Sequence, residues 1–261
     1  MLHKLPPELL SIVLSYISCN DLATLRLLSK QLCTFCDYPV HWKSIILAQE
    51  DHSIWQLQSI KAIIDPHLYS IKSITVEKVR DSVVRYILSR CLNLTCLSIC
   101  GWLTLSDHSL RLPSQQLLRL EKLELIGSTS QPNYISVDAR TLGKLLVQSP
   151  NLKDLLILCQ VHIHAETFVS ELEKSPVRLS LRSLTLATRK TWLDEHVHRL
   201  VSRCPEIQNI RLIQGFDRNE NSNFESWCTR RMNSIHWQNS LVSNSEFIVY
   251  NSLFDEHRAR R

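Results

Sequence analysis

The spacing of apolar and polar positions changes along the chain and separates an N-terminal part from the rest. Over residues 5–46, apolar side chains recur every three or four positions, which predicts three or four short helices. Pro6-Pro7 suits the first turn of the first helix, where a backbone N–H would have no partner, and Glu8 complements the positive end of the helix dipole. Asn20-Asp21 is expected to cap a second helix and Ser29 a third. The pattern indicates a small helical module whose isolated core is marginal.

Beyond residue 70 the apolar positions become periodic. Six windows share the spacing apolar-x-x-apolar-x-apolar, and their middle residues are 23, 26, 32, 29 and 26 positions apart. The windows are Ile71/Ile74/Val76, Leu94/Leu97/Ile99, Leu120/Leu123/Leu125, Leu152/Leu155/Ile157, Leu181/Leu184/Leu186 and Ile207/Ile210/Leu212. Helical spacing precedes the second, fourth and sixth windows, at Val83, Val84, Ile87 and Leu88, at Leu142, Leu145 and Leu146, and at Val197, Leu200 and Val201. A helix followed by a short strand is therefore repeated, and each unit has an apolar face that only its neighbours can cover.

The N-terminal module resembles an F-box. The residues that carry the resemblance are Leu5-Pro6-Pro7-Glu8-Leu9-Leu10, Ile12, Leu14, Ile17, Asp21-Leu22, Leu25-Arg26, Ser29-Lys30, Pro39 and Trp42. Leu32-Cys33 departs from the family, which commonly has a Trp-Arg pair at this place. The resemblance implies that the module docks on an Skp-family adaptor and through it joins a cullin-RING ubiquitin ligase.

The residues expected to bind the adaptor are Leu5, Pro6, Glu8, Leu9, Leu10, Leu14, Ile17, Leu22, Leu25 and Trp42. Leu5, Pro6, Leu9 and Trp42 are the foremost of them, because they are expected to flank the bundle rather than to occupy its middle. Taken singly, each apolar residue of the first helix is explained equally well as part of an ordinary helical core.

The periodic part resembles a leucine-rich-repeat domain of an irregular kind, because three of its five intervals lie within the 20 to 29 residues typical of that family and a fourth lies at the edge. The Asn or Cys that the family places three residues after the third apolar position is replaced in the last five windows by Trp102, Ser128, Gln160, Arg189 and Gly215, which predicts uneven turns. A conventional α/β domain with leucine-rich strands is the alternative.

The expected fold class is therefore α/β, with a small N-terminal helical F-box followed by an irregular leucine-rich-repeat solenoid of short parallel strands alternating with helices. Its expected parts are residues 1–47 as the F-box, 48–70 as a helical linker, 71–215 as the solenoid, and 216–261 as a C-terminal cap with a loose tail. Residues 247–250 are expected to form a last strand that closes the solenoid.

Strand periodicity predicts which side chains face a partner. If the apolar residues of each window point inward, the residues that flank the middle one lie on the other face of the sheet. The candidate target-binding residues are Ser73, Thr75, Cys96, Ser98, Lys122, Glu124, Asp154, Leu156, Ser183, Thr185, Asn209 and Arg211, together with Leu158. A solvated sheet face gives the same polar mixture, whereas the apolar pair Leu156 and Leu158 is unusual on such a surface.

Composition narrows the classes of function. The 261 residues include 43 leucines, 40 of them before residue 201, but only 4 glycines, which stand singly. Glycine-rich phosphate-binding loops, and with them Rossmann and P-loop nucleotide sites, are therefore not expected. The formal net charge of +5 is too small and too evenly mixed to indicate nucleic-acid binding, and no membrane span or signal peptide is expected. The 9 cysteines are interpreted as buried free thiols in a cytoplasmic or nuclear protein.

No motif predicts catalysis, a metal site or a cofactor. Cys33 and Cys36 have the spacing of a redox or zinc pair, but they lie in a helical stretch without a second pair. His162 with His164, and His196 with His198, have no Glu or Cys at a fixed ligand spacing.

The chain is thus expected to be a non-enzymatic substrate receptor of a Skp–cullin–F-box ubiquitin ligase, which binds a target protein through its repeats. A repeat scaffold that is not coupled to ubiquitylation is the second hypothesis. A Cys/His enzyme is the third.

Overall fold

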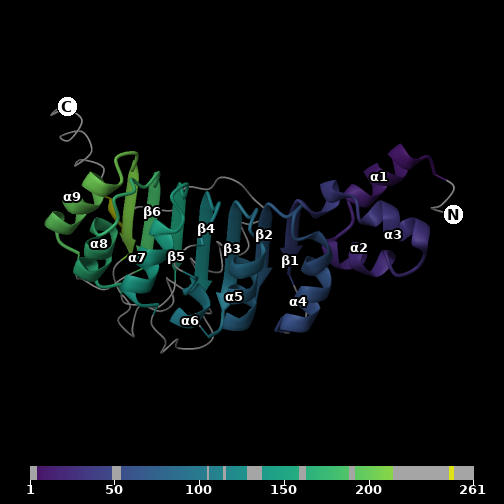
Figure 1. Ribbon diagram of the computed structural model, residues 1–261, viewed down its shortest axis with the longest axis horizontal. Helices are drawn as coiled ribbons and strands as arrows, with labels where there is room; N and C mark the ends of the chain where they lie inside the picture. The colour runs from purple at the N-terminus through teal and green to yellow at the C-terminus, as the bar shows by residue number, and fades with distance from the viewer. Residues whose placement is uncertain are drawn as a thin grey trace.

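A computed structural model of the protein describes residues 5–48, 54–104, 106–113, 116–127, 137–158, 163–187, 192–213 and 247–249. A compact group of helices at the N-terminus continues into a long array of strands and helices (Figure 1). The N-terminal helices are α1 Pro7–Ser15, α2 Cys19–Leu25, α3 Lys30–Cys36 and the 3-10 helix η2 Pro39–Trp42. The remaining helices are α4 Leu57–Ile64, the 3-10 helix η3 Asp65–His67, α5 Asp81–Arg90, α6 Asp107–Leu110, α7 Ala139–Val147, α8 Ala165–Glu173 and α9 Asp194–Arg203.

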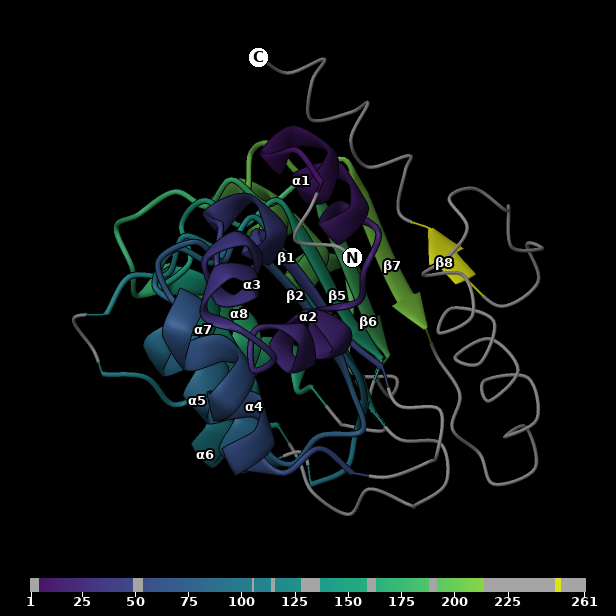
Figure 2. The ribbon, with the colours of Figure 1, turned by 90° about the vertical axis from the view of Figure 1, so that its right-hand side faces the viewer.

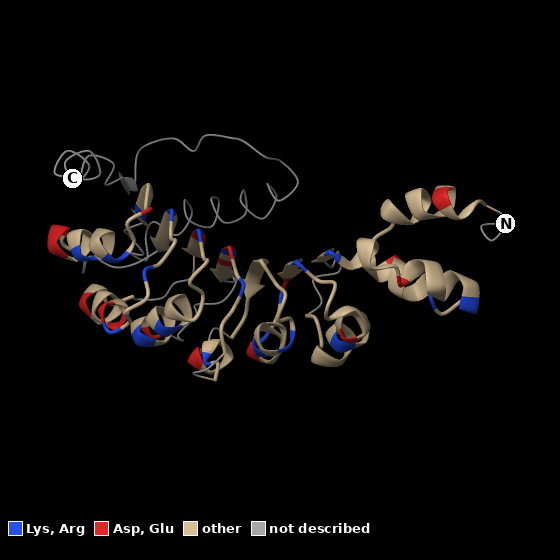
Figure 3. Cartoon of the chain, turned by 45° about the horizontal axis from the view of Figure 1, so that its top comes forward, with Lys and Arg blue, Asp and Glu red and all other residues tan. Residues whose placement is uncertain are grey.

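The strands form one sheet in which spatial order follows chain order. They are β1 Ser44–Leu47, β2 Ser73–Glu77, β3 Cys96–Trp102, β4 Lys122–Gly127, β5 Asp154–Leu158, β6 Ser183–Ala187, β7 Asn209–Ile213 and β8 Phe247–Val249. Strands β1 to β7 are parallel, and β8 pairs antiparallel with β7. The helices between the strands cover one face of the sheet and lie along the outer side of a curved array (Figures 2 and 3). The arrangement is a mixed α/β, solenoid-like fold.

The register of the sheet confirms the six predicted windows. Their middle residues pair across neighbouring strands in the order Ile74, Leu97, Leu123, Leu155, Leu184 and Ile210. All eighteen apolar residues of the windows are buried. A shift of one residue in any strand would turn its apolar side chains to the opposite face, so burial of this row keeps the strands aligned.

The sheet begins earlier than the sequence predicts. Ile45 of β1 pairs with Ile74 of β2, so the first strand lies within the predicted F-box module rather than after residue 71. Helix α4, which falls in the predicted linker at 48–70, buries Ile60, Ile63 and Ile64 in the same core as the later helices. Residues 44–70 thus supply a strand and a helix of the array. Trp42, Ile45 and Leu47 have the same spacing as the six windows, but they overlap the helical pattern of the predicted F-box, so β1 was not recognised as a strand.

The N-terminal helices follow the predicted order with one changed cap. The side chain of Ser29 accepts a hydrogen bond from the N–H of Leu32 at 3.1 Å and caps α3 as predicted. Helix α2 is instead capped by Ser18, whose hydroxyl oxygen accepts from the N–H of Asp21 at 3.2 Å. The expected cap at Asn20-Asp21 is therefore wrong, because the helix already begins at Cys19.

Of the predicted C-terminal part, 216–261, the structure describes only 247–249. Strand β8 confirms those three residues of the predicted last strand, and its Phe247 pairs with Ile213 of β7. The remaining residues of that part lie outside the described residues. So do Ser128, Gln160, Arg189 and Gly215, which stand where the leucine-rich-repeat family has Asn or Cys. No helix in the described ranges is long and apolar enough to cross a bilayer.

Close packing of α7 on α8 depends on Gly143. A Cβ atom at this position would lie 2.8 Å from Cβ of Glu171 and 3.0 Å from its Cγ. Because Glu171 Cβ is fixed to the helix backbone, a side chain at 143 can be accommodated only if the two helices separate.

We expect Gly143→Val to lower the free energy of unfolding by about 1–3 kcal/mol, because the added atoms overpack the α7–α8 contact. Chemical denaturation of the purified protein measures the change. Lys144→Val, at the neighbouring exposed position, is the control for the helix propensity of valine. An equal loss in both variants would contradict the packing explanation.

Candidate functional site

Helix α1 has two apolar faces, and only one of them is buried. Leu10 and Leu14 lie in the core. On the other face, apolar side chains at helical spacing are exposed: Leu9 by 50%, Ile12 by 55%, Val13 by 39% and Tyr16 by 87%. These four residues, which we call the α1 stripe, have the spacing i, i+3, i+4, i+7 of a single helix face. An exposed stripe of this kind indicates a surface that binds another protein.

The α1 stripe is one part of a larger exposed apolar surface on the N-terminal helices. Leu5 precedes α1, Leu27 and Leu28 lie between α2 and α3, and Tyr38 and Val40 lie after α3, all with large exposed fractions. Most of the large exposed apolar side chains of the described residues belong to these helices and the turns between them. Figure 1 shows that α1 and α3 lie at the end of the molecule, away from the strands.

The predicted adaptor-binding residues divide into two groups. Leu5, Pro6, Glu8 and Leu9 are exposed, and Ile17 and Leu25 are half-buried. Leu10, Leu14, Leu22 and Trp42 are buried among the protein's own side chains, so their surfaces are not available to a partner. For these four, and for Trp42 above all, the structure indicates a role in the core in place of the predicted contact.

Sequence reasoning also missed several exposed residues. Val13 and Tyr16 are exposed on α1 but are not among the predicted adaptor-binding residues. The signal that could have identified them is the width of the apolar pattern, since α1 carries apolar residues on more than one side.

Trp42 joins the N-terminal helices to the sheet. Its indole Nε1 donates a hydrogen bond to the carbonyl of Cys36 at 2.6 Å. Its ring stacks on His67, which follows α4, with 3.8 Å between centroids and 9° between planes. Both side chains are buried. Asp37 lies beside them and forms an ion pair with Arg26 at 2.8 Å. This contact fixes the N-terminal helices to the first helix of the array.

His67 is neutral in this contact. Burial, with a smaller effect of the Arg26 charge, lowers the pKa of His67 from its usual 6.5 to about 4. The carboxylate of Asp37 lies 3.7 Å from His67 Nε2, but it does not offset the cost of burying a positive charge. Protonation of His67 would therefore place an unfavourable charge between the helices and the sheet.

The register places the candidate target-binding residues in two rows on the face of the sheet opposite the core. The first row is Ser73, Cys96, Lys122, Asp154, Ser183 and Asn209, and the second is Thr75, Ser98, Glu124, Leu156, Thr185 and Arg211. The prediction that these side chains share one face is thus confirmed. Asp154 and Arg211 are exposed, whereas Ser98, Glu124 and Thr185 are buried.

Two features of this face differ from the expectation. Leu158 has an exposed fraction of 0%, and it pairs with Ile126 at 1%, so it is not a surface neighbour of half-buried Leu156. Glu124 accepts a hydrogen bond from Ser98 at 2.9 Å and lies 3.0 Å from Lys122 Nζ. Three of the candidate residues therefore already bind one another, and a partner that used Glu124 would have to displace Lys122.

Five of the described thiols are poorly suited to act as nucleophiles or metal ligands. Burial raises the pKa of Cys91 and of Cys204 to about 12, and it also raises the pKa values of Cys19, Cys36 and Cys96. These thiols remain protonated at neutral pH, whereas nucleophiles and ligands are thiolates. Among the described residues no group of three or more His, Cys, Asp and Glu side chains is arranged to hold a metal ion.

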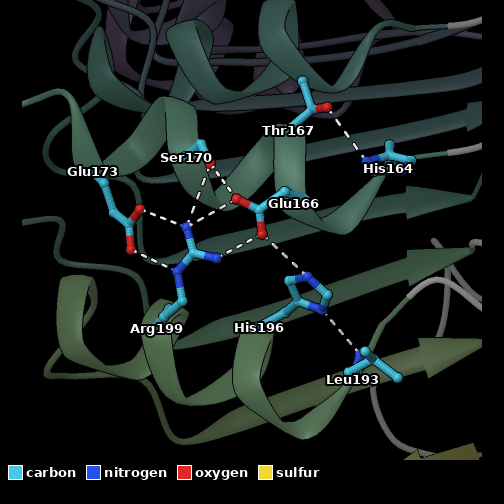
Figure 4. Close-up of polar contacts among 8 residues, drawn as sticks. All are labelled: His164, Glu166, Thr167, Ser170, Glu173, Leu193, His196 and Arg199. Carbon is cyan, nitrogen blue, oxygen red and sulfur yellow. Dashed lines mark hydrogen bonds and ion pairs between the residues drawn. The ribbon is translucent and has the colours of Figure 1, made fainter.

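The densest polar cluster lies between α8 and α9 on the outer side of the array (Figure 4). Arg199 donates to Glu166 at 2.6 Å and to Glu173 at 2.6 Å. The hydrogen bonds that Glu166 accepts from Arg199 and Ser170 lower its pKa to about 2. His196 Nδ1 accepts from the N–H of Leu193 at 3.1 Å, so Nε2 carries the proton and faces Glu166 at 3.3 Å. Both nitrogens of His196 are therefore occupied, which leaves it unsuited to the metal role considered for it. The cluster holds two neighbouring helices together.

Comparison with known proteins bears on the N-terminal helices. Residues 2–44 match the F-box domain family. F-box domains bind Skp-family adaptors and thereby link to cullin-RING ligases, so the match implies adaptor binding for this part of the chain. The matched segment contains the α1 stripe and ends at the first residue of β1. No curated protein matches the chain significantly.

We expect the protein to lose stability in acid because His67 must be neutral in the fold. Its folded pKa, near 4, lies below the usual 6.5, so the unfolded chain takes up the proton first as the pH falls. The contribution of neutral His67 to the free energy of unfolding is fully present above about pH 6.5 and is lost as the pH falls toward 4. We expect this loss to be about 1–3 kcal/mol.

Urea unfolding at pH 7 and pH 5 measures this loss. His67→Phe keeps a ring against Trp42 but should reduce the difference in the free energy of unfolding between the two pH values. His108→Phe, at an exposed histidine, is the control. The explanation fails if His67→Phe retains the full pH dependence.

Proposed function

We propose that the protein is the substrate-recognition subunit of a Skp–cullin–F-box ubiquitin ligase. The observation that carries the proposal is the α1 stripe, an exposed apolar helix face within a segment that matches the F-box domain. A helix that presents such a face is completed by an apolar groove on another protein. The adaptor supplies the groove, and the exposed residues Leu5, Pro6 and Leu9 lie at the centre of the contact.

The array of strands and helices is proposed to be a leucine-rich-repeat domain that binds the target protein. Support comes from strands that pair in chain order and from a polar sheet face that lies opposite the core. Asp154 and Arg211 on this face are exposed and open to a target. The half-buried residues of the face are Ser73, Thr75, Cys96, Lys122, Leu156, Ser183 and Asn209.

The mechanism proposed for the subunit is positional. It holds the target near a ubiquitin-loaded enzyme, which raises the effective concentration of the target's amino groups there. No catalytic group of this chain is required, and the raised pKa values of its buried thiols agree with that role. We further propose a cytoplasmic or nuclear location, which the seven free cysteines of the described residues support.

The stripe gives the direct test of adaptor binding. We expect Leu9→Asp with Ile12→Asp to weaken binding to a purified Skp-family adaptor by about 30-fold or more, because two apolar contacts are replaced by charges at the centre of an interface. Isothermal titration calorimetry of the full chain measures the affinity.

Leu193→Asp is the control, because Leu193 is also exposed, by 63%, but precedes α9 at the far end of the array. If wild-type protein does not bind the adaptor, the proposed function is wrong. Adaptor binding without recruitment of a cullin would support the alternative of a repeat scaffold.

The sheet face gives a second, separable test. We expect Thr75→Arg with Leu156→Arg to remove the target while adaptor affinity stays unchanged, because large charged side chains block the face without entering the core. Quantitative mass spectrometry of proteins retained by the tagged wild-type and variant chains in the same cells measures the loss. Retention of all partners at equal levels would exclude this face as the binding site.

A further inference from the structure

Three consecutive turns between a helix and a strand each expose one large apolar side chain. Tyr69 before β2 is exposed by 88%, Leu92 before β3 by 55% and Leu117 before β4 by 67%. All three lie at the edge of the sheet where the parallel strands begin. Neither the α1 stripe nor the target-binding face includes this edge, so its apolar surface has no role in the function proposed above.

Each of these turns also carries an exposed cation. Lys72 follows Tyr69, Arg90 precedes Leu92, and Arg119 follows Leu117, each within three residues. We call these six residues the turn strip. Within the described residues none of the three cations forms an ion pair with a carboxylate.

The cations of the turn strip differ from those of the turns that follow it, because the latter form ion pairs. In the next turn Lys153 is paired with Glu121 at 2.7 Å, and farther along Arg182 is paired with Glu206 at 3.1 Å. Asp65, which precedes the first turn, accepts a hydrogen bond from Tyr86 and keeps its negative charge. The negative charge of Glu121, in the third turn, is matched by Lys153, so the three cations of the strip exceed the one remaining carboxylate, Asp65, and the strip keeps a net positive charge.

Side-chain hydrogen bonds hold the three turns side by side. Asn93 Nδ2 donates to the carbonyl of Tyr69 at 3.1 Å, and Arg119 donates to Asn93 Oδ1 at 3.1 Å. Thr95 Oγ1 donates to the carbonyl of Lys72 at 2.9 Å. The backbone of the strip is thus ordered before any partner arrives, which lowers the entropy cost of binding.

We propose that the turn strip binds an extended segment of a partner protein in which acidic residues alternate with leucine or aromatic residues. The positive charge of the strip selects the acidic residues, and its apolar side chains cover the apolar ones.

The test uses a fluorescein-labelled peptide of about ten residues in which Glu and Leu alternate, titrated with the full chain in fluorescence anisotropy. We expect saturable binding whose affinity falls as salt is added. The affinity should also fall about tenfold in the double variant Tyr69→Ser with Leu117→Ser, and about tenfold in the single variant Lys72→Glu. All three positions are exposed, so the variants should fold, and thermal unfolding checks this. Leu193→Ser and Lys144→Glu are the controls for the same changes at exposed positions elsewhere.

Three results would overturn the proposal: no binding of the Glu-Leu peptide, equal binding of a peptide with Lys in place of Glu, or equal loss of affinity in the controls. Concentration-dependent dimerisation that Tyr69→Ser with Leu117→Ser abolishes, without peptide binding, would instead assign the strip to a contact between two copies. Adaptor affinity, measured on the same variants, should not change. Failure of the strip is therefore distinguishable from failure of the proposed function.

Discussion

The apolar side chains on the inner face of the parallel strands form one continuous core, and this core is shielded from water only if both ends of the array are covered. Helices protect it along one face, but the first and last strands still expose an edge and an open end of the core. At the N-terminal end α2 packs on β1, where the thiol of Cys19 donates to the carbonyl of Ser44. At the other end β8 pairs with β7. The F-box helices therefore act as the N-terminal cap of the array, and the buried core runs without interruption from Leu10 to Leu212.

This use of the F-box as a cap fixes the orientation of two surfaces. The stack of Trp42 on His67 lies where the N-terminal helices meet the first helix of the array, and both rings are buried. A flexible tether would let the two surfaces move independently. A buried contact holds them in one orientation, and the proposed positional role would need such a defined distance between the adaptor and a target. The contact is consequently relevant to function even though neither Trp42 nor His67 is open to a partner.

Sequence periodicity predicted the array well and its beginning poorly, for one physical reason. A strand buried against helices on one face must repeat its apolar residues with period two, so the windows at Ile74 to Ile210 were visible and their register followed from alignment. Strand β1 is only four residues long and lies next to helices with their own apolar pattern, so the same signal was hidden. The exposure of Tyr16 and the burial of Leu158 depend on which elements cover a face, and spacing within one element does not contain that information.

The two faces of α1 show how folding and binding compete for the same residues. A helix of nine residues cannot remain helical in water by its own propensity, so its inner face must be held by the core. Leu10 and Leu14 serve that purpose, and they are conspicuous in the sequence because their spacing is that of a core helix. The residues left for a partner alternate with them along the sequence, from Leu9 to Tyr16, and have the same apolar character. Spacing alone therefore assigns both sets to one face, and only the position of the other helices separates the residues that stabilise the fold from those that remain open to the adaptor.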